Sequence, residues 1–260
     1  MNNKKIVYYE NELEDEFSEA QLDTVHIGAD YEYCRDGAWR RFTHVFWYRV
    51  VATPLAFLYS RLVLGQRIVG SEVMRPYLGG GFFMFGNHTQ PVGDALMPHM
   101  IWTRKEKYTV VNPSNLKAHI VGPVTPSLGA LPLPSTRAAQ RSFYSAIERR
   151  IGEGAAIIIY PEAHIWPWCS FIRDFRDDSF YYPVKMNVPS FSFTNVYMKR
   201  RHSEKPRIVT YVDGPFFPDD TLPYRERRRD LAEQVKRKMR ERAALSDCEY
   251  IKYLKKEDVK

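Results

Sequence analysis

The residues of this chain best suited to chemistry are a histidine and an aspartate in the run from Asn87 to Asp94. An aspartate can accept a hydrogen bond from one imidazole nitrogen, which fixes the other nitrogen as a proton acceptor. His88 and Asp94 are therefore candidates for a general base and the carboxylate that orients it. The same residues allow a plainer interpretation, in which Asn87 caps a turn and His88 is a core histidine with its hydrogen bonds satisfied.

Two short apolar stretches would position this chemistry. The first runs from Phe82 to Phe85, lies between glycines and ends just before His88. The second runs from Ala155 to Tyr160 and ends in Pro161-Glu162-Ala163-His164. Short apolar runs bounded by turn residues are typical of buried strands. Because α/β sheets place their sites at the carboxyl ends of strands, we expect both polar segments at one end of the sheet.

Together the two segments resemble the glycerolipid acyltransferases of the lysophosphatidic-acid acyltransferase type. Members of that family carry Asn-His, four residues and Asp, and further along an aromatic-Pro-Glu-Gly-Thr-Arg block. This sequence matches in order and in the spacing of the blocks over roughly residues 40–215, but five residues separate His88 from Asp94. The second block has Ala163, His164 and Ile165 in place of Gly, Thr and Arg.

We expect Gly93 to absorb the extra residue between His88 and Asp94. Glycine adopts backbone conformations that are closed to other residues. A bulge at Gly93 would then bring the carboxylate back to the imidazole.

The order of the apolar runs predicts the fold. Strand runs alternate with helical patterns from residue 82 to residue 212, which is typical of an α/β domain. We expect a single α/β domain with a central, mostly parallel sheet flanked by helices. The resemblance to the acyltransferase family further implies membrane-docking helices on the N-terminal side of this domain. The expected divisions are a polar arm over residues 1–38, a docking segment over 39–70 and an acyltransferase domain over 71–260.

The resemblance implies an O-acyltransferase similar to 1-acylglycerol-3-phosphate acyltransferases. Such an enzyme would move a fatty acyl group from acyl-CoA or acyl carrier protein to a hydroxyl of a lysophospholipid or glycerol-phosphate-like acceptor, in phospholipid biosynthesis. An acyl thioester is already activated, so no serine nucleophile, cofactor or metal is expected. The reaction needs a base for the hydroxyl proton, here His88 oriented by Asp94, and donors for the tetrahedral oxyanion.

Other residues are expected to bind the substrates. The oxyanion could be served by Asn87 or by a backbone N–H of the Thr89-Gln90 turn, and the sequence does not choose between them. Glu162 would hold the acceptor at the end of the second strand. The expected substrate-binding residues are Asn87, Gly93, Arg137, Pro161, Glu162 and His164.

A weaker match concerns a third block of the family, Gly-x-Ile-Phe-Ile-Asp-Arg. Residues 129–134 resemble its first part, but Ser135 stands where the family has arginine, and Arg137 is the nearest candidate cation. Ser135 or Thr136 is expected to cap the following helix.

Composition limits the partners and the compartment. The chain has 38 basic and 31 acidic residues, a net charge of +7 and a pI near 9.2. This balance favours anionic partners such as lipid headgroups or phosphorylated substrates. The cysteines, Cys34, Cys169 and Cys248, are few and widely spaced, which indicates a reducing compartment. The N-terminus lacks the pattern of a signal peptide, and the carboxylates from Glu10 to Glu19 suggest a solvated arm or a short helix.

Residues 39–69 have the character of an interfacial segment. The run is rich in aromatic and aliphatic residues but is interrupted by Arg49, Arg61 and Pro54. A clean membrane-spanning helix needs ~20 apolar residues with few charges. The pattern therefore favours two short helices in or dipping into the interface, with arginines reaching lipid phosphates. Ordinary core helices and a span are the alternatives. We expect a peripheral or re-entrant protein on the cytoplasmic side of the cell membrane, bound to membrane lipids.

Several other functions fit the sequence less well. A serine hydrolase is disfavoured because the chain has no Gly-x-Ser-x-Gly elbow. A nucleic-acid binder is suggested only by charge and by the basic final helix, and no recognised module is present. A metal hydrolase using His88, Asp94, His99 and His164 lacks a helical pair of histidines. A catalytically inactive lipid- or acyl-binding protein on the same fold is the main alternative.

Overall fold

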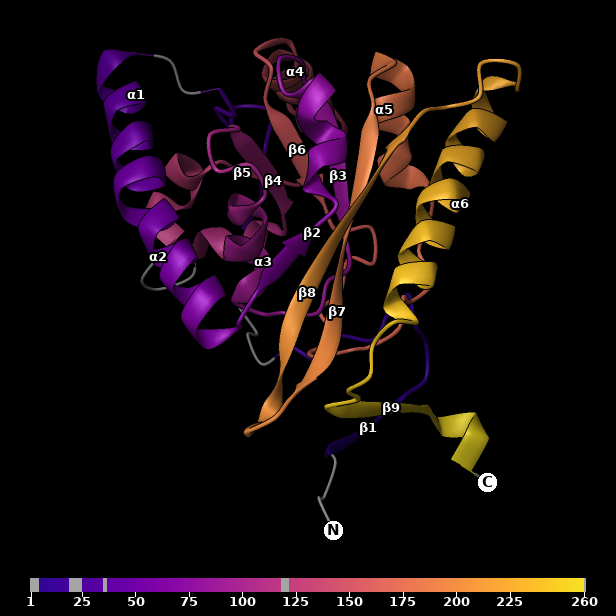
Figure 1. Cartoon of the computed structure of the whole chain (residues 1–260). Helices are drawn as coiled ribbons and strands as arrows, with labels where there is room; N and C mark the ends of the chain where they lie inside the picture. The colour runs from indigo at the N-terminus through magenta and orange to yellow at the C-terminus, as the bar shows by residue number, and fades with distance from the viewer. Residues whose placement is uncertain (1–4, 19–24, 35–36, 118–121, 260) are drawn as a thin grey trace.

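The computed structural model describes residues 5–18, 25–34, 37–117 and 122–259. The polar arm predicted for residues 1–38 is therefore described only in part, and Glu19 lies outside the described residues. Within them, seven strands form one sheet in the order β2-β8-β7-β3-β6-β4-β5, and β1 pairs with β9 in a second, small sheet (Figure 1). The strands are β1 (Lys5–Tyr9), β2 (Arg67–Val69), β3 (Phe82–Gly86), β4 (Lys107–Val111), β5 (Ala130–Pro132), β6 (Ala156–Ile159), β7 (Ser190–Arg200), β8 (Ser203–Phe216) and β9 (Ile251–Lys255).

The main sheet is parallel except where β7 and β8 pair as an antiparallel hairpin. The central strand β3 pairs in parallel with β6 on one side and with β7 on the other. β6 in turn pairs with β4, and β4 with β5, again in parallel. The predicted α/β fold with a mostly parallel sheet flanked by helices is thus confirmed. The segments that follow β3 and β6 leave the sheet at the same end, as expected.

Alternate side chains of the central strands enter two separate cores. Phe83 and Phe85 pack with Ile157 and Ile159 against the helices on one face. Phe82, Met84 and Ile158 face the opposite side. Because successive strand residues point to opposite faces, the apolar runs read from the sequence are buried on both sides. The helices are α1 (Ala38–Val45), α2 (Thr53–Leu58), α3 (Gly93–Leu96), α4 (Arg137–Gly152), α5 (Tyr181–Met186) and α6 (Tyr224–Ala243).

Tight 3-10 turns and two π-helical stretches complete the chain. Thr136, one of the two predicted caps of α4, accepts a hydrogen bond from the backbone N–H of Ala139 at 3.1 Å. After Asp94 the helix is short, since α3 passes directly into a 3-10 turn. These elements are η1 (Phe46–Ala52), η2 (Tyr59–Val63), η3 (Ser71–Tyr77), η4 (Met97–Met100), η5 (Pro113–Lys117), η6 (Gly122–Leu128), η7 (Asp178–Phe180) and η8 (Lys256–Val259).

The expected docking segment forms one uninterrupted helical run over residues 38–63, along the β5 side of the sheet (Figure 1). The prediction of two short helices separated at Pro54 is wrong. In the π-helical turn before the proline, the N–H of Thr53 bonds the carbonyl of Tyr48, so the widened turn accommodates the missing N–H of Pro54. Within the described ranges, no helix has the length and apolar composition needed to cross a membrane.

This helical run is fastened to the sheet by a polar cluster. Glu106 accepts hydrogen bonds from His44 at 2.6 Å and from Arg49 at 2.8 Å. Tyr48 lies on the same side of the helical run and is buried, with its ring centroid 4.9 Å from that of His99. The opposite side remains open to solvent, with Trp39 and Leu62 each 73% exposed.

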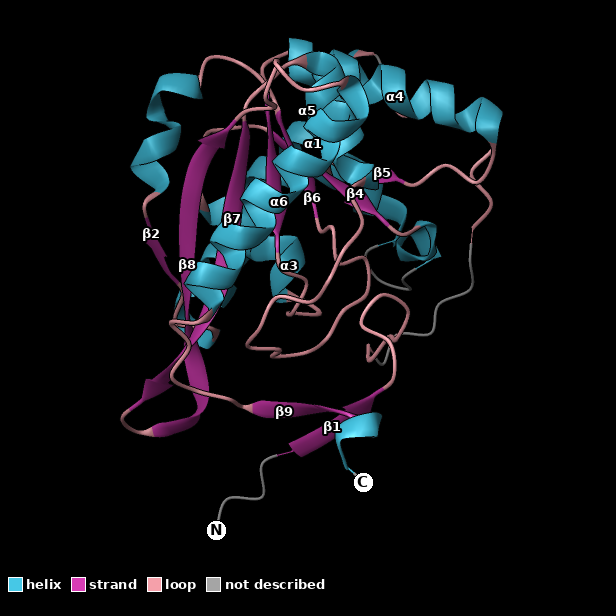
Figure 2. Cartoon of the chain, turned by 90° about the vertical axis from the view of Figure 1, so that its right-hand side faces the viewer, coloured by secondary structure: helices cyan, strands magenta, loops and turns pink. Residues whose placement is uncertain are grey.

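The N-terminal segment does not behave as the predicted solvated arm. Residues 5–9 form β1, which pairs in parallel with β9 below the carboxyl ends of the central strands (Figure 2). The carbonyl of Asp15 accepts a 2.7 Å hydrogen bond from the indole of Trp166. Phe17 packs its ring against the same indole at 5.1 Å. Aromatic packing and backbone pairing thus hold this acidic stretch, here called the strap (residues 5–18), against the body.

Candidate active site

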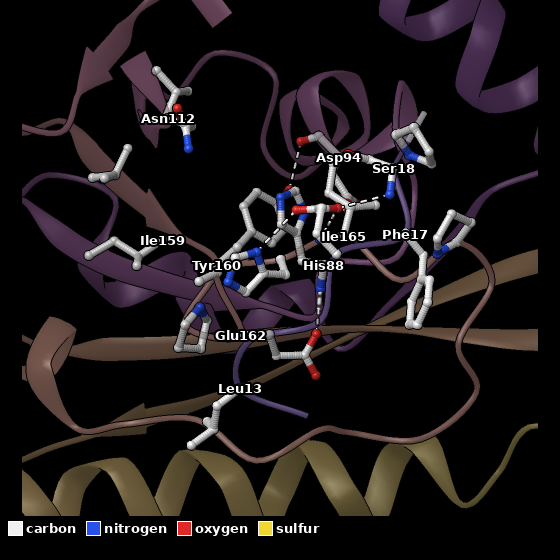
Figure 3. Close-up of a pocket in the computed structure, with 18 of the residues that line it drawn as sticks. Leu13, Phe17, Ser18, His88, Asp94, Asn112, Ile159, Tyr160, Glu162 and Ile165 are labelled. Carbon is white, nitrogen blue, oxygen red and sulfur yellow. Dashed lines mark hydrogen bonds and ion pairs between the residues drawn. The ribbon is translucent and has the colours of Figure 1, made fainter. Parts of the chain in front are cut away.

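The predicted histidine–aspartate pair is formed in the structure (Figure 3). The Nδ1 of His88 lies 2.8 Å from Oδ2 of Asp94. His88 follows the end of β3, where Gly86 is required because a Cβ there would lie 2.2 Å from the ring of Phe193. The close packing of β7 against this glycine fixes the point at which the chain leaves the sheet.

Asp94 is held through one of its two carboxylate oxygens. Its Oδ2 also accepts hydrogen bonds from the backbone N–H groups of Thr89 at 2.8 Å and Gln90 at 2.9 Å. The residue is 3% exposed, and burial raises the pKa of this carboxyl, while the hydrogen bond from His88 opposes that rise. With Oδ2 fixed by two amides, His88 must present Nδ1–H to it, and Nε2 is left as the basic nitrogen.

Tyr160 fixes the other side of the histidine. Its ring stacks on that of His88 with centroids 4.5 Å apart and planes 19° apart. Its hydroxyl donates a 2.6 Å hydrogen bond to the backbone carbonyl of Asp94. The His88 side chain remains 18% exposed, and no hydrogen bond joins Nε2 to another described residue. This nitrogen is therefore positioned to take a proton from a bound hydroxyl.

The expected bulge at Gly93 is absent. Gly93 is the first residue of α3, and the N–H of Asp94 bonds the carbonyl of Gln90 at 2.9 Å. The extra residue is absorbed by this helical turn, not by a left-handed glycine. Gly93 is nevertheless needed, because a Cβ would lie 2.8 Å from Cβ of Gln90 and 3.1 Å from Leu64.

Neither group expected to serve the oxyanion is free to do so. Asn87 is 1% exposed, and its side chain makes two hydrogen bonds with the backbone of Asn195, at 3.1 and 2.8 Å. The N–H groups of Thr89 and Gln90 are already occupied by Asp94. Asn87 thus ties β3 to β7 and is not a substrate-binding residue, which corrects the prediction.

Glu162 also has a different role from the one predicted. Its side chain is fully buried, with one oxygen 2.9 Å from the backbone N–H of His88 and the other 3.0 Å from that of Arg173. The Arg173 guanidinium, itself fully buried, lies 3.2 Å from the carboxylate and over the ring of Trp166. Because the carboxylate is fully buried and bonded to the backbone of His88 and to Arg173, Glu162 positions the histidine instead of holding the substrate.

Sequence reasoning did not find Arg173. It lies 11 positions after Glu162 in a segment without regular structure, so no periodic pattern marks it. The only signal was indirect, since a buried glutamate at the end of a strand requires a cationic or hydrogen-bonding partner.

A large, open cavity of about 2150 Å³ lies in front of the histidine. Pro161 and His164 line it, as expected, together with residues of the strap and of α4, α5 and α6. Arg137 is exposed at the start of α4 and is not among the lining residues. Ser135 does not face a substrate either, since it exchanges backbone and side-chain hydrogen bonds with Ile27 at 3.1 and 3.0 Å. Among the residues that the structure describes, no cluster of three His, Cys, Asp or Glu side chains could hold a metal ion.

The mostly parallel sheet, with helices on both faces, has the same fold as a solved acyltransferase. The structure is similar to the crystal structure of the 1-acyl-sn-glycerophosphate (LPA) acyltransferase PlsC from Thermotoga maritima, with a TM-score of 0.54 and 19% sequence identity. The match covers 79% of this chain and 87% of that one. No protein-family model and no curated protein matches the sequence. The resemblance predicted from the sequence is thus confirmed at the level of the fold.

Proposed function

We propose that this protein is an O-acyltransferase that moves an acyl group from a thioester donor to the hydroxyl of a glycerolipid-like acceptor. The observation that carries the proposal is the His88–Asp94 pair, whose free Nε2 faces a cavity large enough for two substrates. The fold that it shares with an LPA acyltransferase supports the same chemistry. The inactive-binder alternative rested on the extra residue between His88 and Asp94, and the 2.8 Å contact removes that reason.

The reaction would proceed by general-base catalysis. His88 Nε2 takes the proton of the acceptor hydroxyl as its oxygen attacks the thioester carbonyl carbon. The tetrahedral intermediate then expels the thiolate, which receives the proton back from the imidazolium, and the new ester is released. Asp94 stabilises the imidazolium and keeps Nδ1 protonated, as the carboxylate does in hydrolase triads. Tyr160 positions the histidine by stacking on its ring, and Glu162 positions it by accepting a hydrogen bond from its backbone N–H.

The donor in this proposal is acyl-CoA or acyl carrier protein, and the acceptor is a lysophospholipid or a glycerol-phosphate-like molecule. Both donors present an acyl thioester on a phosphate-bearing arm. The cavity is lined by the cations Lys5, Arg176, Lys205 and Arg228, which are suited to phosphate groups.

The test is acyl transfer from each thioester donor to a panel of lysolipids and glycerol phosphate. We expect His88→Ala to lower kcat by roughly 10²–10⁴-fold, the usual worth of general-base catalysis. His202→Ala is the matched control, since His202 is exposed in the β7–β8 turn. Equal rates for His88→Ala and wild type would show that His88 is not the base.

We further propose that the helical run over residues 38–63 docks the protein on the cytoplasmic face of the cell membrane. Its outer side exposes large apolar side chains, and such a surface on a helix is typical of an interfacial element. Arg41 near its start, exposed to solvent, adds attraction to anionic lipids. The exposed apolar residues of the run are Trp39, Phe42, Val45, Phe46, Val50, Leu55, Phe57, Leu58, Leu62 and Val63.

Sedimentation with lipid vesicles tests the docking surface. Replacing Trp39, Phe42 and Leu62 together by serine should abolish binding, while Leu245→Ser, at an exposed apolar residue outside the run, should not affect it. High salt should release the wild type only in part, because screening weakens the charge contribution but not the apolar one. Undiminished binding of the triple variant would refute this placement.

A further inference from the structure

The strap forms one wall of the cavity in front of His88. Its lining residues include Leu13, Glu14, Glu16 and Phe17, and Figure 3 shows Leu13, Phe17 and Ser18 among the side chains drawn around His88. The strap is held there at several points, by β9, by Trp166 and by a 2.8 Å hydrogen bond from the N–H of Asp174 to Glu12. It is therefore part of the site and not a loose extension.

This wall contains a second histidine–carboxylate pair in the same cavity. Nδ1 of His164 lies 3.2 Å from one carboxylate oxygen of Glu16. The other oxygen accepts hydrogen bonds from the backbone N–H groups of Ile165 at 3.1 Å and Ser18 at 2.9 Å. Burial alone would raise the pKa of Glu16, but hydrogen bonds from Ser18, His164 and Ile165 lower it, so the group is ionised at neutral pH. His164 keeps Nε2 available, with its side chain 35% exposed.

The pair lies next to the position at which the resembled acyltransferases have an arginine. Here that position is Ile165, whose N–H is bound by Glu16. With His164 protonated the pair has no net charge, and with His164 neutral it has one negative charge. In neither state can it neutralise a phosphomonoester dianion as a guanidinium would.

A second carboxylate strengthens this charge pattern. Glu14 is exposed on the cavity wall, and its side chain makes no hydrogen bond or ion pair with the described residues. The other strap carboxylates are occupied elsewhere: Glu10 pairs with Lys256, and Asp15 accepts from backbone N–H groups at the start of its own turn. The strap itself contributes one cation to the cavity, Lys5 at its start, and the other cations, Arg176, Lys205 and Arg228, come from other segments.

We infer that Glu14, Glu16 and His164 form the headgroup contact of the acceptor and select a lysolipid whose head carries an ammonium group over one that ends in a phosphomonoester. The inference rests on the proposed acyltransferase function and names its acceptor class. The ammonium donates hydrogen bonds to the Glu14 and Glu16 carboxylates. Nε2 of His164 forms a further hydrogen bond with the polar head, as an acceptor when the ring is neutral and as a donor when it is protonated. These are specificity-determining residues, and His88 remains the base.

The experiment compares three lysolipids with the same acyl chain and the same thioester donor. Their heads are a phosphomonoester, an ethanolamine phosphodiester and a glycerol phosphodiester, the last being anionic without an amine. Each of the two carboxylates is expected to contribute about a fivefold preference for the ammonium head. We therefore expect kcat/KM for the ethanolamine head to exceed that for the phosphomonoester by roughly 25-fold.

Removing the two charges should erase this preference. In the Glu14→Gln/Glu16→Gln variant, the change should appear in the KM of the acceptor, while kcat and the KM of the donor stay the same. Glu10→Gln is the matched control, because Glu10 belongs to the strap but not to the cavity lining. Glu14→Gln alone should give about a fivefold change, and it breaks no bond with the described chain, so it tests the inference even if the double variant is unstable.

The possible outcomes separate this inference from the proposed function. A wild-type preference for the phosphomonoester, or a ratio unchanged in the Gln variants, overturns the inference while acyl transfer stands. Equal rates for the two phosphodiesters overturn the role of the ammonium. If no acceptor turns over, the proposed function fails. Equilibrium binding of the ethanolamine and phosphomonoester lysolipids, followed by tryptophan fluorescence, then decides the inference: selective binding of the ethanolamine head supports it and unselective binding overturns it.

Discussion

Replacing Glu162 with glutamine distinguishes a structural carboxylate from one that binds substrate. The side chains of Glu162 and Arg173 are both fully buried, 3.2 Å apart. Glutamine keeps the shape and one acceptor oxygen but leaves the guanidinium without its counter-ion. Breaking a buried ion pair by removing one partner costs about 3–5 kcal/mol. Arg173 keeps the carbonyls of Glu12 and His164 and the ring of Trp166, so we expect a loss near the lower end, about 3 kcal/mol.

Urea unfolding followed by tryptophan fluorescence measures this loss, and a double-mutant cycle with Arg173→Met assigns it to the pair. We expect the double variant to be more stable than the sum of the single changes implies, with a coupling of about 2 kcal/mol. Glu153→Gln is the control, because Glu153 pairs with arginines at the surface and should change stability by no more than about 1 kcal/mol.

The kinetic expectation follows from the hydrogen bond that Glu162 accepts from the backbone of His88. In Glu162→Gln, kcat should fall because the base is displaced, and the KM of the acceptor should change little. Unaltered stability together with a raised KM of the acceptor would refute this reasoning and restore Glu162 as an acceptor-binding residue.

Three further predictions concern the catalytic turn and the buried charges. Asp94→Asn should lower kcat by roughly 10²–10⁴-fold, because an amide cannot stabilise the imidazolium; wild-type kcat would exclude Asp94 as the orienting group. Gly93→Ala should lower both the unfolding free energy, by about 1–3 kcal/mol, and kcat, since its Cβ would meet Gln90. Gly152→Ala, where a Cβ meets nothing, should do neither, and equal effects of the two would contradict the packing argument. Burial, with the nearby Arg49 charge, lowers the pKa of Lys107 from 10.5 to about 7.

The sign of the Lys107 effect follows from proton binding. Between pH 7 and 10.5 the unfolded chain holds a proton that the folded protein has released, so the unfolding free energy should rise with pH by up to about 1.4 kcal/mol per unit. Below pH 7 both states are protonated and this contribution is flat. Lys107→Met should reduce the slope in urea unfolding measured from pH 7 to 10, and an identical slope would refute the assignment.

The sequence predicted those parts of the fold whose signal is local. β3 and β6 are continuous apolar runs, so their predicted positions agree with the structure within a few residues. β1, β2 and β9 are short and gain stability only from partners far along the chain. No local pattern marks such strands, which is why the strap was taken for a solvated arm.

For the candidate site, the sequence indicated the right segments but not every role. His88 and Asp94 were predicted as a pair, and the structure places them 2.8 Å apart. The roles of Asn87 and Glu162 depend on Asn195 and Arg173, residues that only the folded chain brings near. A polar side chain beside a histidine has the same appearance in a sequence whether it faces a substrate or another strand.

The pairing of β1 with β9 has a consequence for the order in which the protein is made. Glu10 and Lys256, which form an ion pair beside these strands, are 246 positions apart. At typical rates of translation, roughly 12–50 s pass between the emergence of the first strand and that of its partner. His88 and Asp94 can meet early, but β1 can pair with β9 only after residues 251–255 have been made. A nascent chain that has not yet reached β9 therefore holds the histidine–aspartate pair without the strand pairing that fixes the strap beside the cavity.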